Sequence, residues 1–115
     1  MIHQLLSSIN KVIHFTEVSA HCDIPCKIYD PVSAQLASLT VIRLLDLMSE
    51  LTEKKELSLS EQAQLSRLVV QKEEHAKKVK DEITIIWGDY FKKPQFESFP
   101  DSHQLVHSIM LQASK

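Results

Sequence analysis

Apolar residues recur three and four positions apart along residues 31–54, which is the spacing that places them on one face of a helix. The stripe consists of Ala37, Val41, Leu44, Met48 and Leu51. Asp30 and Pro31 stand before it, and this pair predicts a helix start with Asp30 as the cap and Pro31 in the first turn. The pattern predicts one long helix with a single buried face.

A second helix is predicted over residues 59–90. Ser58 and Glu61 form the sequence of a capping box at its start. The apolar stripe is interrupted only at Lys72, and it consists of Leu65, Val69, Ala76, Val79, Ile83, Ile86 and Tyr90. Pro94 and Pro100 then bracket a predicted loop. A third helix is predicted from about residue 101, with Leu105 and Ile109 facing inward.

No segment alternates apolar and polar residues for long enough to predict a strand. The chain has one glycine, which disfavours an all-β fold with many tight turns. The predicted fold is therefore all-α, an antiparallel up-and-down helix bundle with three clear helices.

Composition narrows the classes of function. The 115 residues suit one domain, and the 43% hydrophobic and 24% charged content is typical of a soluble globular chain. The net charge of −2 lacks the basic excess of a nucleic-acid-binding protein. No uninterrupted apolar run approaches the roughly 20 residues of a membrane-spanning helix, so no membrane partner is expected.

The chemistry-bearing motif is His21-Cys22-Asp23-Ile24-Pro25-Cys26. It offers one imidazole and two thiols on a chain that Pro25 forces to turn. Two sulfurs and two nitrogens in a plane suit nickel(II) or copper(II), whereas zinc prefers four side-chain ligands in a tetrahedron. From spacing alone, a pair of reduced cysteines in a loop stays an open alternative.

Two segments resemble one known family. HCDIPCKIYDP at residues 21–31 resembles the nickel-binding hook that opens mature nickel superoxide dismutases. IIWGDYFKKPQFESFP at residues 85–100, followed by His103-Gln104-Leu105, resembles a second motif of that family. The resemblance implies a four-helix bundle assembled into a homohexamer. It also implies conversion of superoxide to oxygen and hydrogen peroxide by one redox-active nickel ion (Ni2+/Ni3+) per subunit.

The resemblance also implies how the site is made. A leader of residues 1–20 would be removed by a leader peptidase, leaving a hook and helix-bundle domain of residues 21–115. The His21 amine, the Cys22 backbone nitrogen and the thiolates of Cys22 and Cys26 would form the square plane, with the His21 imidazole as the axial ligand. Tyr29 and Tyr90 would hold a water or an anion near the open face. Asp23 and the bend at Pro25 would shape the hook. The family has a cis peptide bond before this proline, which corresponds to the Ile24-Pro25 bond here.

The leader itself carries a helical apolar stripe over residues 2–13. Val18-Ser19-Ala20 looks like a signal-peptidase site, but polar residues break the apolar stretch and the charged start is missing. These features favour a cytoplasmic location over export.

Departures from the family pattern leave a second function open. Ala37 and His75 stand where some family members brace the axial histidine with a glutamate and an arginine. The chain stops at Lys115, where the family continues into a final long helix, so an open apolar groove is expected. Subunit contacts or the leader helix would cover it. The alternative function is a truncated, non-catalytic nickel- or copper-binding relative that handles metal or binds a partner.

Two further sets of residues are expected to be structural. His103 and His107 lie four apart on a helix, yet no carboxylate or cysteine at suitable spacing joins them, so an exposed or interface helix is predicted. Trp87 and Phe91 are predicted to belong to the core.

Overall fold

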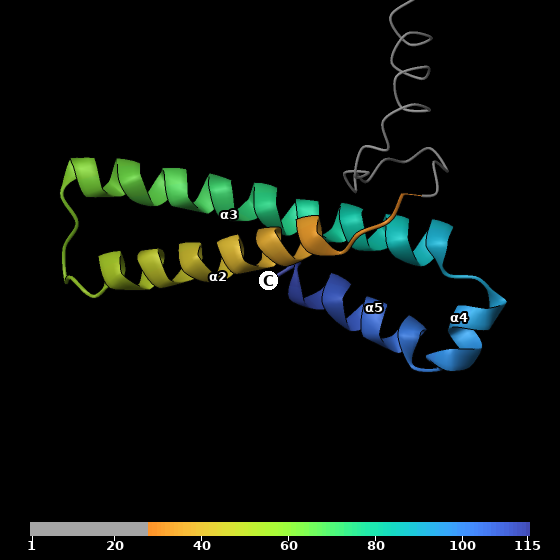
Figure 1. Ribbon diagram of the computed structural model, residues 1–115. Coiled ribbons are helices and arrows are strands. Elements are labelled where there is room, and N and C mark those ends of the chain that lie inside the picture. The colour runs from red at the N-terminus through yellow and green to blue at the C-terminus, as the bar shows by residue number, and fades with distance from the viewer. Residues whose placement is uncertain (1–27) are drawn as a thin grey trace, which may run out of the picture.

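The computed structural model describes residues 28–115, and within this range every regular element is a helix and no strand is present (Figure 1). Its elements are α2 (Val32–Thr52), α3 (Leu59–Ile85), the π-helical turn η1 (Ile86–Tyr90), α4 (Lys93–Ser98) and α5 (Ser102–Gln112). Helices α2 and α3 lie side by side and antiparallel, and α5 runs back along them from the far end of α3 (Figure 1). The predicted all-α fold is confirmed.

Local sequence sets the start of each long helix. Pro31 occupies the N-cap of α2, so the helix begins one residue later than predicted, and the Val32 backbone N–H donates to the carboxylate of Asp30 at 2.9 Å. The predicted capping box of α3 is present, with Ser58 and Glu61 bonded reciprocally. Hydrogen bonds from Lys54 and then from Ser58 lower the pKa of Glu61 to about 2.

The contact between α2 and α3 is built on small side chains. Ala34 and Ala37 of α2 and Ala76 and Val79 of α3 are the buried hydrophobic residues of the described range. Small residues let two helix backbones approach closely, and the larger stripe residues of α2 are half-buried beside them. The predicted stripe of α2 is therefore confirmed as the inward face.

The stripe of α3 differs from the prediction at three positions. Lys72 does not interrupt it, because its side chain is only 12% exposed and its ammonium group pairs with Glu73 at 2.9 Å. A lysine can bury its methylene stem in this way while its charge stays near water. Val69 and Tyr90 lie at the exposed margin instead.

The segment bracketed by Pro94 and Pro100 is not the predicted loop. Residues Lys93–Ser98 form the short helix α4, with Pro94 in the first turn, where its missing N–H breaks no helical hydrogen bond. Helix α5 begins one residue after the predicted start. Ile109 is half-buried as predicted, whereas Leu105 faces the α2–α3 pair as predicted but remains 62% exposed.

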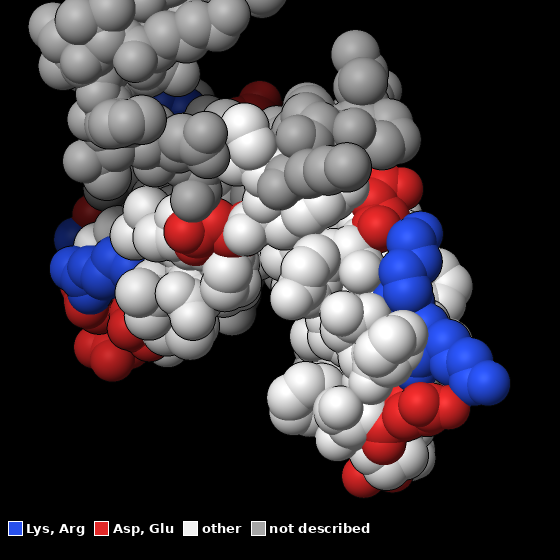
Figure 2. All heavy atoms as spheres, turned by 45° about the vertical axis from the view of Figure 1, so that its right-hand side comes forward, with Lys and Arg blue, Asp and Glu red and all other residues white. Residues whose placement is uncertain are grey.

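An open apolar groove separates α5 from the α2–α3 pair. Its volume is about 440 Å³, and Val41, Ile42, Val79, Leu105 and Ile109 are among its lining residues. A second hollow of about 590 Å³, reaching Pro31 and Ile83, shares Ser38, Val79 and Ile109 with it. In Figure 2 the charged side chains lie mainly along the outer edges, and the surfaces that face each other across the central gap are largely uncharged. The open apolar face expected from the sequence is present in this part of the chain.

Helix α2 is long and apolar enough to cross a membrane, with a mean hydropathy of 1.3 over its most apolar window. The search for uninterrupted apolar runs did not find this helix, because Arg43, Asp46 and Glu50 divide it into shorter apolar stretches. One such helix is weak evidence for a membrane, since a core helix of a soluble protein passes the same test.

Candidate metal centre

The predicted metal ligands His21, Cys22 and Cys26 lie outside the described residues, as do Asp23, the Ile24-Pro25 peptide and residues 1–20. Their assigned roles stay predictions. The other two predicted site residues, Tyr29 and Tyr90, are described. Three peptide units join Cys26 to Tyr29, and these can span at most about 11 Å.

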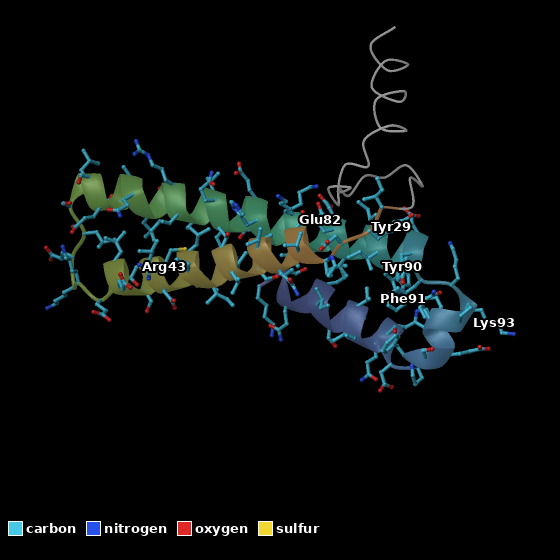
Figure 3. All side chains as sticks on the ribbon, in the orientation of Figure 1. Tyr29, Arg43, Glu82, Tyr90, Phe91 and Lys93 are labelled. Carbon is cyan, nitrogen blue, oxygen red and sulfur yellow. The ribbon has the colours of Figure 1, made fainter. Side chains whose placement is uncertain are left out.

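Tyr29 and Tyr90 lie together although 61 positions separate their numbers in the sequence. Their ring centroids are 5.5 Å apart, and the rings are tilted by 46°. Tyr29 is half-buried, and Tyr90 is 47% exposed, so the pair is accessible to solvent (Figure 3). A segment preceding α2 and a turn following α3 thus place two phenol groups at one end of the molecule.

The π-helical turn η1 determines where Tyr90 lies. The Phe91 N–H donates to the Ile86 carbonyl at 3.1 Å, which closes a wider turn than an α-helix has. Phe91 then packs against Tyr90 with ring centroids 5.8 Å apart, and against Phe96 of α4 at 5.5 Å. These ring contacts link Tyr90 to the helix that follows the turn.

A second set of contacts, which the sequence did not predict, centres on His103 of α5. The Trp87 indole N–H donates to His103 Nδ1 at 3.1 Å, and the two rings meet edge to face. Phe96 stacks on the His103 imidazole with a centroid distance of 4.3 Å and an angle of 17°. Trp87 is 37% exposed, so the prediction that it is a core residue is wrong, whereas Phe91 is half-buried.

His107, one turn after His103, is exposed. Among residues 28–115, no group of three or more His, Cys, Asp or Glu side chains could hold a metal ion. His103 is exposed as well, so both histidines lie on an exposed helix as predicted.

The two family bracing positions have different surroundings. Ala37 is buried against α3. His75 is half-buried, and its Nδ1 lies 2.7 Å from the Gln71 carbonyl, to which it must donate because a carbonyl oxygen only accepts. The imidazole of His75 is thus engaged with its own helix.

Glu82 is a further carboxylate at this end of α3 that the sequence analysis did not single out (Figure 3). Its side chain is half-buried rather than fully solvated. Neighbouring Asp81 and Lys80 belong to a mixed-charge run, and such a run carries no sign of which member turns inward.

The comparisons with known proteins agree on one family. Residues 16–115 match the family described as nickel-containing superoxide dismutase. The chain is 36% identical over 93 residues to superoxide dismutase [Ni] of Streptomyces coelicolor, covering 81% of this chain and 65% of that protein. It is 38% identical over 94 residues to superoxide dismutase [Ni] of Streptomyces seoulensis, covering 82% of this chain and 66% of that protein.

Among solved structures, a native nickel superoxide dismutase is similar with a TM-score of 0.67 and 34% identity, covering 82% of this chain and 74% of that one. The chain thus spans just under two thirds of the length of the two curated relatives. The match over residues 16–115 includes the hook, both tyrosines and the Trp87–His103 segment. The chain belongs to the nickel-containing superoxide dismutase family.

Proposed function

We propose that this chain is a superoxide dismutase that converts superoxide to oxygen and hydrogen peroxide with one nickel ion per subunit. The observation that carries the proposal is the Tyr29–Tyr90 pair, whose rings lie 5.5 Å apart and are accessible to solvent. Tyr29 follows Cys26, the last proposed ligand of the hook, by three positions in the sequence. Family membership supports the same assignment.

The donor set fits nickel. His21 would contribute its amine and imidazole, Cys22 its backbone nitrogen and thiolate, and Cys26 its thiolate. Thiolates are soft ligands, and two sulfurs with two nitrogens suit the square-planar geometry of nickel(II) better than the tetrahedron of zinc. When bound, nickel would supply the one-electron couple that lets two superoxide molecules react in turn.

The tyrosines would act on what enters the site. A phenol hydroxyl can donate a hydrogen bond to an anion or accept one from water. Two such groups on neighbouring rings would hold an ordered water or a superoxide anion by hydrogen bonding and would select small ligands. Asp23, inside the hook, is proposed to shape the turn at Pro25.

The test of the function is superoxide decay followed after pulse radiolysis, on chain that begins at His21 and has been given one equivalent of nickel. We expect one bound nickel per chain by elemental analysis and a catalytic rate proportional to nickel content. A chain that binds nickel stoichiometrically and does not accelerate superoxide decay would contradict the dismutase assignment and would favour a metal-handling role.

Tyr90→Phe is expected to change anion sensitivity with little effect on folding. The ring contacts with Tyr29 and Phe91 need no hydroxyl, so the melting temperature should stay close to that of the unsubstituted chain. Azide inhibition and the pH dependence of turnover should change, because a bound anion or water loses a hydrogen-bond partner. Identical inhibition and pH profiles in the two proteins would remove Tyr90 from the site.

We also propose that the chain works as a homo-oligomer whose subunits cover the apolar groove. Ile42 lines this groove and is 57% exposed, and Leu36 and Leu39 of α2 are similarly exposed. Apolar surface of this extent is characteristic of interfaces. The family hexamer is the assembly that we expect.

Ile42→Asp is accordingly expected to shift the assembly towards monomer, because a carboxylate would have to be desolvated within the interface. Light scattering coupled to gel filtration measures the mass. Arg43→Asp, one position further on and not among the residues lining the groove, is the matched control and should keep the assembly intact. Equal masses for Ile42→Asp and the unsubstituted chain would exclude the groove as the interface.

A further inference from the structure

The turn η1 carries two aromatic residues that point to different partners. Tyr90 packs against Tyr29, next to the hook. Trp87, three residues earlier in the same turn, contacts His103 of α5. One helical turn therefore carries both the contact with Tyr29 and the contact with α5.

His103 connects the turn to both helices that follow it. Its Nδ1 accepts the indole N–H of Trp87 at 3.1 Å, and its ring stacks on Phe96 of α4 at 4.3 Å. Phe96 in turn contacts Phe91, and Phe91 contacts Tyr90. The contacts form a closed circuit from Trp87 through His103, Phe96 and Phe91 back to the turn.

The circuit needs an acceptor and a flat ring in one side chain. An indole N–H can only donate, so Nδ1 of His103 has to be unprotonated and the ring proton is on Nε2. A phenylalanine at this position would keep the stacking on Phe96 and lose the acceptor. A glutamine would keep an acceptor oxygen and lose the stacking.

We propose that His103 is a positioning residue for Tyr90: through Trp87 and Phe96 it holds η1 so that the Tyr90 ring stays against Tyr29. The proposal builds on the proposed dismutase function, because it places Tyr90 in the site, but it makes a claim about geometry that needs no metal. His103 itself is exposed on α5.

The first test uses the metal-free full chain, so that its outcome does not depend on dismutase activity. His103→Phe should shift the emission of Trp87, which is the only tryptophan in the chain, and weaken the nuclear Overhauser contacts between the Tyr29 and Tyr90 rings. His107→Phe, the same substitution one turn away, is the control and should change neither. His103→Gln should restore the Trp87 emission in part. Unchanged emission and ring contacts in His103→Phe, with helicity preserved, would overturn the proposal.

The second test is a double-mutant cycle on the processed, nickel-loaded holoenzyme. The net contribution of one neutral hydrogen bond corresponds to about a three- to tenfold change in an equilibrium or a rate. If His103→Phe displaces Tyr90, we expect turnover to fall by this factor. Because the effect acts through Tyr90, the same substitution in a Tyr90→Phe background should cost no further activity. Additive losses in the double variant would show that His103 acts by another route and would overturn the proposal.

Discussion

Cys26→Ser and Cys22→Ser are each expected to abolish nickel binding at the hook while leaving the helices intact. A serine hydroxyl is a hard, weakly acidic ligand that is protonated at neutral pH, so it cannot replace a thiolate on nickel. Loss of a residue that only orients a metal ligand already weakens metal binding by about 10- to 100-fold. Loss of a direct ligand should weaken binding more than this. Superoxide turnover should fall to background.

The bundle should be insensitive to these two substitutions. The buried residues of the α2–α3 contact begin at Ala34, and the carboxylate that bonds the first N–H of α2 belongs to Asp30, so both lie after the hook in the sequence. Far-ultraviolet circular dichroism and the melting temperature should therefore match those of the unsubstituted chain. Nickel content and the thiolate-to-nickel absorption bands measure the binding. Cys26→Ser protein that still held nickel and turned over superoxide would show that the proposed ligation is wrong.

The full chain beginning at Met1 is expected to have no dismutase activity, and removal of residues 1–20 should switch activity on. The backbone nitrogen of His21 is part of an amide in the full chain and becomes a basic amine after cleavage before His21. An amide would have to lose a proton to bind nickel, in addition to the backbone nitrogen of Cys22, and the attached leader would crowd the metal. The expected difference is therefore the whole activity rather than a fraction of it.

The measurement compares the full chain with chain that starts at His21, each given one equivalent of nickel under reducing conditions. The full chain should keep its helices and show no square-planar nickel spectrum. A control chain that starts one residue later, at Cys22, should also be inactive, because it has a free amine but lacks the imidazole and shifts the amine by one position. Equal activity in the full chain and the chain starting at His21 would refute the free-amine ligand.

The helices themselves could be predicted because their determinants are local. The capping box of Ser58 and Glu61 lies within four residues, and the α2 stripe repeats every three or four positions. Observed bounds of Val32–Thr52 and Leu59–Ile85 agree with the predicted residues 31–54 and 59–90 once the π-helical turn is counted with the second helix. Backbone hydrogen bonds and side-chain periodicity over a few turns are enough for these features.

The predictions of which side chains are buried or exposed failed where packing, rather than local sequence, decides. Leu105 has the spacing of a buried residue and is exposed, because it faces the open groove between α5 and the α2–α3 pair. Lys72 has the chemistry of an exposed residue, yet its side chain is only 12% exposed and its ammonium group pairs with Glu73. Periodicity states which residues share a face, and only packing states whether a partner covers that face.

The candidate site also combines features that follow from local sequence with features that depend on tertiary contacts. The sequence by itself predicts the hook chemistry, since the proposed donor atoms lie within six residues and would form a ligand set that depends on no distant contact. The tertiary structure alone decided that Tyr29 meets Tyr90 and that His103 meets Trp87 and Phe96. Contacts between residues so far apart in sequence depend on how α3 ends in a π-helical turn and how α5 returns, and on ring geometries that no local pattern encodes.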